Sequence, residues 1–144
     1  MAEQNFKNHT KWVPTFHFFV LPILFINVGF SLYACGKAGF SVTGVLNVLV
    51  DVALLLGFML VRMMATKVQD RVIRLEERVR FEKLLPPDLR ARIGEFTMEQ
   101  ILALRFASDA ELAEIARKVL DEQLNNRKMI KQMIKTWRPD LARA

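Results

Sequence analysis

Residues 41–61 read SVTGVLNVLVDVALLLGFMLV, an apolar run in which Asp51 is the only charged side chain. At about 1.5 Å of rise per residue, a helix of this length crosses the roughly 30 Å hydrocarbon core of a bilayer. A carboxylate at the centre of such a helix costs on the order of 2.5–3.5 kcal/mol on insertion scales. Chains that carry one usually keep it in a protein interior, a cavity or a pore, so Asp51 is the first candidate functional residue.

A second apolar run, PTFHFFVLPILFINVGFSLYAC, precedes it at residues 14–35. It is too long for the core of a secretory signal peptide, and another apolar run follows at once, so we expect an uncleaved span. Pro22 lies inside this span, where the missing N–H predicts a kink. The connector Gly36-Lys37-Ala38-Gly39 is short and rich in turn residues. The spans at about 14–35 and 41–64 are therefore expected to form an antiparallel transmembrane hairpin over residues 14–64.

The basic residues lie mostly on one side of the two spans. Lys37 alone lies in the connector, and the others near the spans are Lys7 and Lys11 before the first and Arg62, Lys67, Arg71 and Arg74 after the second. The positive-inside rule places both termini in the cytoplasm, so residues 1–13 are expected to be a cytoplasmic segment.

The balance of charge and the cysteine count exclude several classes of protein. Only three of the 21 basic and two of the 15 acidic residues precede Arg62, which leaves 18 against 13, a net charge of +5, in the rest. Beside a membrane anchor, this excess favours anionic lipid over nucleic acid as a partner. Cys35 is the single cysteine, so it forms no internal disulfide and is expected to be a packed thiol. No phosphate-binding loop, dinucleotide fingerprint, zinc motif or nucleophile elbow is present, and we expect no enzyme, cofactor or metal site.

Three polar side chains of the two spans are expected at similar depth. Asn47 precedes Asp51 by four residues, so the two share a helix face, and Asn27 of the first span falls at an intermediate depth. Asn27, Asn47 and Asp51 are predicted to form one hydrogen-bonded cluster, within a hairpin or between subunits. In one interpretation the asparagines hold a mostly protonated Asp51 and join helices together. In the other, several copies present Asp51 and Asn47 to a pore for cations or protons.

The second span is expected to continue as a helix through residues 65–85, because neither Gly nor Pro interrupts residues 58–85. Val68, Val72, Leu75 and Val79 follow the 4-3-4 spacing of a coiled-coil seam. Asp70 with Arg74, and Glu76 with Arg80, have the i,i+4 spacing of helix ion pairs. The seam lasts only about two heptads, so the alternative is a helix packed on its own C-terminal domain.

Residues 86–144 are expected to form a small helical domain. Thr97 to Gln100 and Ser108 to Glu111 both have the spacing of a capping box and predict two helix starts. A last helix is predicted from about Asn126 to Trp137. Its candidate lipid-surface residues are Arg127, Lys128, Lys131, Lys135 and Trp137. The alternative, which we favour, is that its apolar side packs on the preceding helix to complete the core.

Several stretches resemble a family of small, uncharacterised bacterial two-span membrane proteins. They are Asn5-Phe6-Lys7-Asn8-His9-Thr10, Phe16-His17-Phe18-Phe19, Leu21-Pro22-Ile23-Leu24, Leu84-Leu85-Pro86, Leu89-Arg90-Ala91-Arg92-Ile93 and Ala103-Leu104-Arg105-Phe106-Ala107-Ser108-Asp109. The resemblance covers most of the chain and implies a setting in the bacterial inner membrane. It implies no activity, cofactor or ligand, so it assigns no functional residue.

The sequence thus predicts an all-α membrane protein: a transmembrane hairpin, a second helix that extends into the cytoplasm, and a small helical domain. The leading hypothesis for function is a non-enzymatic, self-associating scaffold or accessory subunit of a larger membrane complex. A small homo-oligomeric cation or proton channel is the first alternative, and an anionic-lipid surface sensor is the second.

Overall fold

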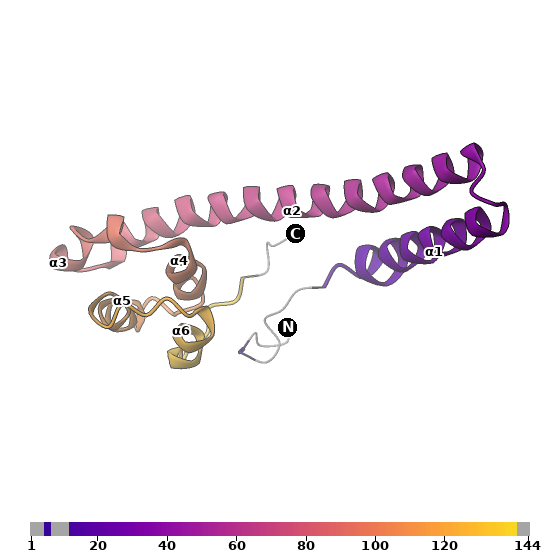
Figure 1. Cartoon of the computed structure of the whole chain (residues 1–144). Helices are drawn as coiled ribbons and strands as arrows, with labels where there is room; N and C mark the ends of the chain where they lie inside the picture. Colours follow the sequence, from indigo (N-terminus) through magenta and orange to yellow (C-terminus); the bar gives the residue numbers. More distant parts are fainter. Residues whose placement is uncertain (1–4, 7–11, 141–144) are drawn as a thin grey trace. The chain divides into compact units, whose positions relative to one another are not determined.

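In the computed structural model, residues 5–6 and 12–140 are described, and the regular elements in these ranges are all helices (Figure 1). The chain divides into two compact units. We call Trp12–Thr66 the apolar unit, and Lys67–Ala144 together with Met1–Lys11 the charged unit. The predicted N-terminal segment, residues 1–13, lies almost wholly outside the described residues. The expectation of an all-helical protein is confirmed.

The first apolar run forms two kinds of helix that meet just before Pro22. A π-helix, η1, covers Thr15–Val20, and the α-helix α1 covers Leu21–Lys37. Pro22 has no N–H to offer the carbonyl four residues back, and the wider π spacing moves each bond to a donor one residue later. At the junction, the N–H of Leu21 accordingly bonds to the carbonyl of Phe16, five residues back. The sequence predicts a kink inside one helix at Pro22, whereas the structure changes helix type there.

The second long helix, α2, runs without interruption over Val42–Leu84, 43 residues. This confirms the expected continuation of the second apolar run through the extension. The connection from α1 is short, and Gly39 and Phe40 turn the chain with φ values of 65° and 58°. These left-handed values cost a glycine little. Pro86 and Pro87 follow the end of α2 because proline cannot continue a helix.

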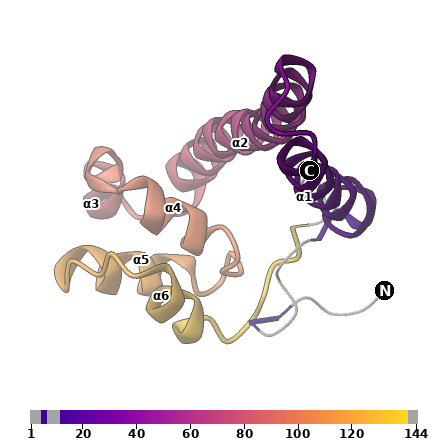
Figure 2. The same cartoon turned by 45° about the vertical axis from the view of Figure 1, so that its right-hand side comes forward.

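Five short helical elements of the charged unit surround its core: α3 (Pro87–Arg90), η2 (Ile93–Glu95), α4 (Met98–Leu104), α5 (Leu112–Asp121) and α6 (Arg127–Met133) (Figure 2). The largest fully buried side chains are Phe81, Leu85, Leu89, Ile101, Leu104, Phe106, Leu112, Val119 and Ile130. Phe81 lies in the last turn of α2, and Leu85 directly follows the helix. The helix that leaves the apolar unit therefore supplies part of this core.

The two predicted capping boxes have different outcomes. At α4, Thr97 accepts from the N–H of Gln100, and the Gln100 side chain accepts from the N–H of Thr97, so that box is confirmed. At Ser108 only half of the box forms: the carboxylate of Glu111 accepts from the N–H of Ser108 at 3.4 Å, but α5 begins at Leu112 with no side-chain cap. The same carboxylate also accepts from the backbone N–H groups of Lys135 and Thr136, at 3.1 and 3.0 Å. The side chain that the local pattern assigned to a helix start thus makes a long-range contact as well.

The last helix is about one turn shorter than predicted. Asn126 caps its start by accepting from the N–H groups of Lys128 and Met129. The chain becomes extended at Ile134, after which Arg138 donates its N–H to the carbonyl of Phe106 at 2.8 Å. Pairing of this segment with residues 106–108, through an isolated bridge between Ala107 and Trp137, replaces the last helical turn.

The coiled-coil seam and the packed face of α2 are different faces. Ile73, Glu77 and Phe81 are buried, at 6%, 5% and 0% exposed, on the side that meets the charged unit. The four seam residues are all exposed: Val68, Val72, Leu75 and Val79. The extension thus packs on its own C-terminal domain, but not with the residues that the spacing singles out.

Candidate functional site

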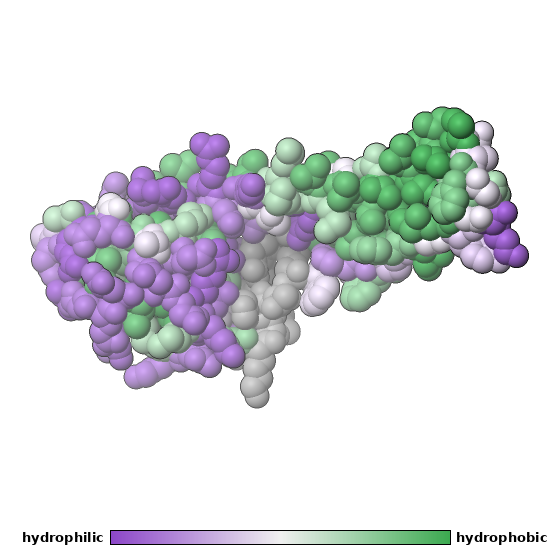
Figure 3. Space-filling model, viewed as in Figure 1, coloured by the Kyte–Doolittle hydropathy of each residue, from purple (hydrophilic) through white to green (hydrophobic). Residues whose placement is uncertain are grey.

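Two helical stretches are long and apolar enough, by length and composition, to cross a membrane: Thr15–Lys37 and Val42–Leu84. Only 6% and 0% of their most apolar windows are buried within the protein. Apolar side chains cover the outside of the apolar unit, whereas hydrophilic ones predominate on the charged unit (Figure 3). Soluble monomers rarely expose apolar patches larger than a few hundred Å². The surface that surrounds Asp51 is therefore suited to lipid or to other protein.

One polar contact joins α1 to α2 inside this apolar unit. The hydroxyl of Ser31 donates a hydrogen bond to Oδ2 of Asp51. Both side chains are half-buried. A bond from a hydroxyl to a carboxylate is of the stronger, charge-assisted kind when the acid is ionised. The one acid of the apolar unit thus has a partner within its own chain.

The two helices lie in close contact beside Gly44. A Cβ atom placed on Gly44 would lie 3.2 Å from Sγ of Cys35 and 3.3 Å from its Cα, tighter than ordinary contacts. Cys35 is 4% exposed, so the expectation of a packed thiol is confirmed. Small residues allow this proximity of helix backbones. On the sides by which α1 and α2 face each other, the less exposed residues are Leu24, Val28, Ser31 and Cys35 of α1 and Gly44, Val48, Asp51 and Leu55 of α2.

Asn27 and Asn47, the other members of the predicted cluster, are both exposed. Among the described residues, the hydrogen bond given to Asp51 comes from Ser31 and not from either amide. Sequence reasoning missed Ser31 because it looked for amides at matching depth. The available signal was a hydroxyl four residues after Asn27, at a position that faces α2. A cluster of the three residues between subunits stays a prediction.

The surroundings of Asp51 limit its chemistry. A carboxylate has room for several hydrogen bonds, and Asn47 lies one turn away on α2, exposed. No group of three or more His, Cys, Asp or Glu side chains that could hold a metal is found in residues 5–6 and 12–140. Asp51 is therefore equipped to accept further hydrogen bonds.

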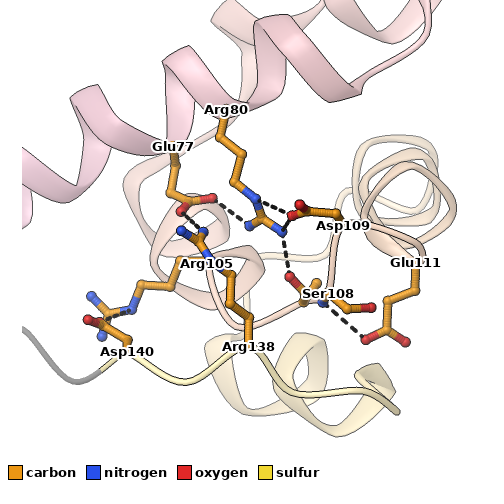
Figure 4. A network of polar contacts seen from close by, with 9 residues as sticks. Glu77, Arg80, Arg105, Ser108, Asp109, Glu111, Arg138 and Asp140 are labelled. Atoms are coloured by element: carbon orange, nitrogen blue, oxygen red, sulfur yellow. Dashed lines mark hydrogen bonds and ion pairs between the residues drawn. The ribbon is translucent and has the colours of Figure 1, made fainter.

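A second polar assembly lies in the charged unit, where Glu77 of α2 is the centre of an ion-pair network (Figure 4). Its two carboxylate oxygens accept from Arg80 at 3.0 Å and from Arg138 at 3.1 Å. Arg80 also donates to Asp109, at 2.9 and 2.6 Å, and to the carbonyl of Ala107 at 2.6 Å. The i,i+4 pair of Glu76 with Arg80 is thus replaced by other partners of Arg80. These bonds attach α2 to two segments far along the chain, which gives the network a structural role.

An open groove of about 950 Å³ runs beside this network in the charged unit. Its charged walls include Arg80, Asp109 and Arg138, which are engaged in the ion pairs described above. Leu75, Val79 and Leu84 form an apolar edge. The exposed side chains of Glu76 and Lys83 also line the groove.

Surface ion pairs shift the pKa values of two groups, Asp88 and Arg92. The side chain of Arg117, hydrogen-bonded to Asp88 at 2.6 Å, lowers the pKa of that carboxyl below its usual range. Hydrogen bonds to Glu95 and then to Asp121 raise the pKa of Arg92 above its usual value. Both groups are at the surface, where such pairs contribute little to stability. They bind α3 and the segment after it to α5.

The predicted lipid-surface residues of the last helix do not share one free face. Arg127 forms an ion pair with Glu99 of α4, and Lys131 lies over the ring of Phe106 at 4.8 Å. Trp137 is partly buried against the core, with its ring centroid 5.0 Å from that of Phe106. Lys128 and Lys135 are exposed. The apolar side of α6, represented by Ile130 at 0% exposed, packs in the core, as the favoured alternative predicts.

A comparison with known families gives one result that covers the whole chain. The model of the Family of unknown function (DUF6526) matches residues 1–144. No curated protein sequence and no solved structure matches the chain.

Proposed function

The chain belongs to this family of unknown function, and we propose that it is a non-enzymatic, self-associating membrane protein that serves as a scaffold or accessory subunit of a membrane complex. One observation carries the proposal. The long apolar stretches Thr15–Lys37 and Val42–Leu84 have almost no buried residues in their most apolar windows, whereas the charged unit has a complete core of its own. A lipid bilayer is the solvent that makes such an exposed apolar unit stable.

The proposed orientation follows from the basic residues near the spans. Arg62 and Lys67 follow the apolar part of α2, whereas Lys37 is alone in the connector. The positive-inside rule then leaves the charged unit in the cytoplasm and the connector outside. By the family resemblance, the proposed location is the bacterial inner membrane.

A scaffold role agrees with how the polar groups are used. Glu77 binds both Arg80 and Arg138, and Ser31 binds Asp51, so these groups hold segments of the chain together. The surface left for partners is the exposed apolar face of the helices. Association through such an apolar face requires no catalytic group.

Two measurements on the full chain test this proposal. Carbonate extraction of native membranes is expected to leave the protein in the pellet, as it does integral proteins. The mass of the protein in detergent, by light scattering with the detergent subtracted, is expected to exceed that of one 16.6 kDa chain. Release by carbonate removes the membrane placement, and a monomer at all concentrations removes self-association.

A homo-oligomeric cation or proton channel is the second candidate, because Asn47 is exposed one turn from the half-buried Asp51. In an oligomer, these side chains would line a shared axis. Proteoliposomes that contain the protein are expected to pass protons or cations if this is so. Asp51→Asn should abolish that flux without changing the mass in detergent, and Asn27→Ala, with an exposed amide on α1, is the matched control. Absence of flux from the wild-type protein removes the channel.

A lipid-surface sensor has less support. The apolar residues that would enter the headgroup region, Ile130 and Trp137, pack against the core of the charged unit. A helix that lies on a membrane needs an apolar face free for lipid. The test places the full chain in nanodiscs of neutral lipid, free of detergent, and adds vesicles of anionic lipid. We expect no salt-sensitive binding of the nanodiscs to these vesicles.

A further inference from the structure

We propose that α2 pairs with α2 of a second copy of this chain as a parallel, in-register, two-stranded coiled coil along Val68, Val72, Leu75 and Val79. This names the surface for the self-association in the proposed function and rests on it. The four side chains are 60%, 47%, 65% and 52% exposed, although each is apolar and each lies on a regular helix. They form one continuous stripe, because spacings of four, three and four residues return to the same side of a helix.

The stripe is exposed, with Leu75 and Val79 at the edge of the groove described above, because the chain packs mainly on another side of α2. Successive residues of an α-helix are rotated by about 100°, so Glu77 points about 200° from Leu75, and Phe81 about 200° from Val79. Glu77 and Phe81 are the buried residues that attach α2 to its own core. The interface with the C-terminal domain and the proposed interface with a second copy can therefore exist at the same time.

The residue types favour a second α2 as the occupant and a pair as the assembly. The spacing places Val72 and Val79 at a positions of the heptad, and Val68 and Leu75 at d positions. β-branched residues at a with leucine at d favour two strands over three or four. At the next d position, Glu82 replaces an apolar residue, so the seam ends where α2 enters the core of the charged unit.

The shared topology of two copies in one membrane selects the parallel orientation, and one flanking ion pair fits it. Arg71 occupies a g position and Glu76 the following e position, and both are exposed. In a parallel pair, each g residue lies beside the following e residue of the partner, so Arg71 meets Glu76 twice by symmetry. At the next g position, Arg78 would lie beside Lys83 of the partner, so the flanking charges by themselves do not decide the orientation. Two copies inserted in one membrane with one topology present α2 in parallel.

The same heptad frame continues in the sequence of the apolar unit. Counted back in sevens, the a positions before Val72 are Ala65, Phe58 and Asp51, and the d positions before Val68 are Val61, Leu54 and Asn47. A polar residue at a core position of a coiled coil fixes the register of the strands. Asn47, exposed at a d position, would thus meet its counterpart across the pair, whereas Asp51 at an a position faces α1 and binds Ser31.

Single-cysteine variants test the surface directly. Cys35→Ala removes the native thiol, and Val72→Cys, Leu75→Cys or Val79→Cys then places one thiol on the seam. Lys67→Cys and Arg74→Cys are matched controls, since both residues are exposed on the same helix but occupy c positions. In native membranes treated with copper phenanthroline, disulfide-linked pairs are expected to form about ten times faster at the three seam positions than at the controls.

The outcomes separate this inference from the proposed function. Equal rates at seam and control positions, in a protein whose mass shows self-association, overturn the seam and leave the scaffold in place. A monomeric mass overturns both. Circular dichroism of each variant confirms that the helix content is unchanged before rates are compared.

A charge exchange tests the orientation independently. Arg71→Glu or Glu76→Arg alone is expected to weaken the pair about threefold, since exposed ion pairs contribute only a few tenths of a kcal/mol each. The double variant should restore wild-type affinity, as measured by dilution in detergent with fluorescence energy transfer. Failure of the double variant to recover any affinity, with seam crosslinks present, overturns the parallel in-register arrangement.

Discussion

Phenylalanine lies outside in one unit of this protein and inside in the other. Phe25 and Phe30 of α1 are 58% and 67% exposed, whereas Phe81 and Phe106 are 0% exposed. The side chains are the same, so the difference comes from what surrounds them. The charged unit alternates apolar and charged residues and buries its apolar side chains in a core, away from water. The apolar unit has almost no polar face to turn outward. One continuous helix, α2, thus has an exposed apolar part and a part whose apolar side is buried.

The largest effect is expected where α2 enters the core of the charged unit. Phe81 is fully buried and packs on Phe96, with ring centroids 5.3 Å apart. Phe81→Ala should lower the free energy of unfolding of the charged unit by about 3–5 kcal/mol, because a large cavity remains. Thermal unfolding of the full chain in detergent, followed by tryptophan fluorescence, measures it.

The matched control for this cavity is Met129→Ala, since Met129 is a large apolar side chain of the same unit that is 51% exposed. Its effect should stay within about 0.5 kcal/mol. Equal effects of the two variants would mean that the charged unit has no packed core, which would end the contrast between the units.

A smaller loss is expected from the ion-pair network. Glu77→Ala leaves Arg80, whose side chain is only 9% exposed, without one of its carboxylate partners. Breaking a buried pair on one side costs about 3–5 kcal/mol, but Arg138, the other partner, is 50% exposed, so we expect about 2 kcal/mol. Glu76→Ala, one residue away and exposed, is the control in the same unfolding assay. A loss under about 0.5 kcal/mol for Glu77→Ala would contradict a structural role of the network.

In the apolar unit, the contact of α1 with α2 is expected to be sensitive to side-chain size at Gly44. Gly44→Leu places atoms where Cys35 lies, so the two helices must move apart to make room. We expect this overpacking to lower the free energy of unfolding by about 1–3 kcal/mol. The buried thiol should then react with a membrane-permeant maleimide about ten times faster. Gly57→Leu is the matched control on α2, because a Cβ there meets nothing within 4 Å. Unchanged reactivity of Cys35 in Gly44→Leu would show that the two helices do not pack at this point.

The smallest effect is expected at the surface of the charged unit. Arg117 lowers the pKa of Asp88 in the folded protein, so the folded state favours the ionised carboxyl. The stabilisation is therefore present above the usual aspartate pKa of about 3.9 and is lost as the pH falls below it. Wild type and Asp88→Asn should differ slightly in melting temperature at pH 6, and the difference should shrink as the pH falls below about 3.9. A gap that widens on acidification would contradict the cause assigned to this shift.

The extents of the long helices could be read from the sequence, because they depend on local features. The absence of Gly and Pro over residues 58–85 predicts an uninterrupted α2, and Pro86 predicts its end. The capping box at Thr97 likewise involves only residues within one turn. The π-helix before Pro22 could not be predicted. Pro22 leaves a carbonyl of the preceding turn without its usual N–H donor, and the sequence does not show whether a kink or a wider helix supplies another donor.

What the sequence by itself determined is that Asp51 lies in an apolar helix and that α2 continues beyond it, because composition and hydrogen bonding within a helix are local. Only the tertiary structure decided that Ser31, and neither Asn27 nor Asn47, donates to Asp51. It also decided that Glu111 binds the backbone at residues 135–136, and that α2 packs through Phe81 and leaves Val72 exposed. The physical reason is that each of these side chains has several local partners of similar energy, and contacts between distant segments select one of them.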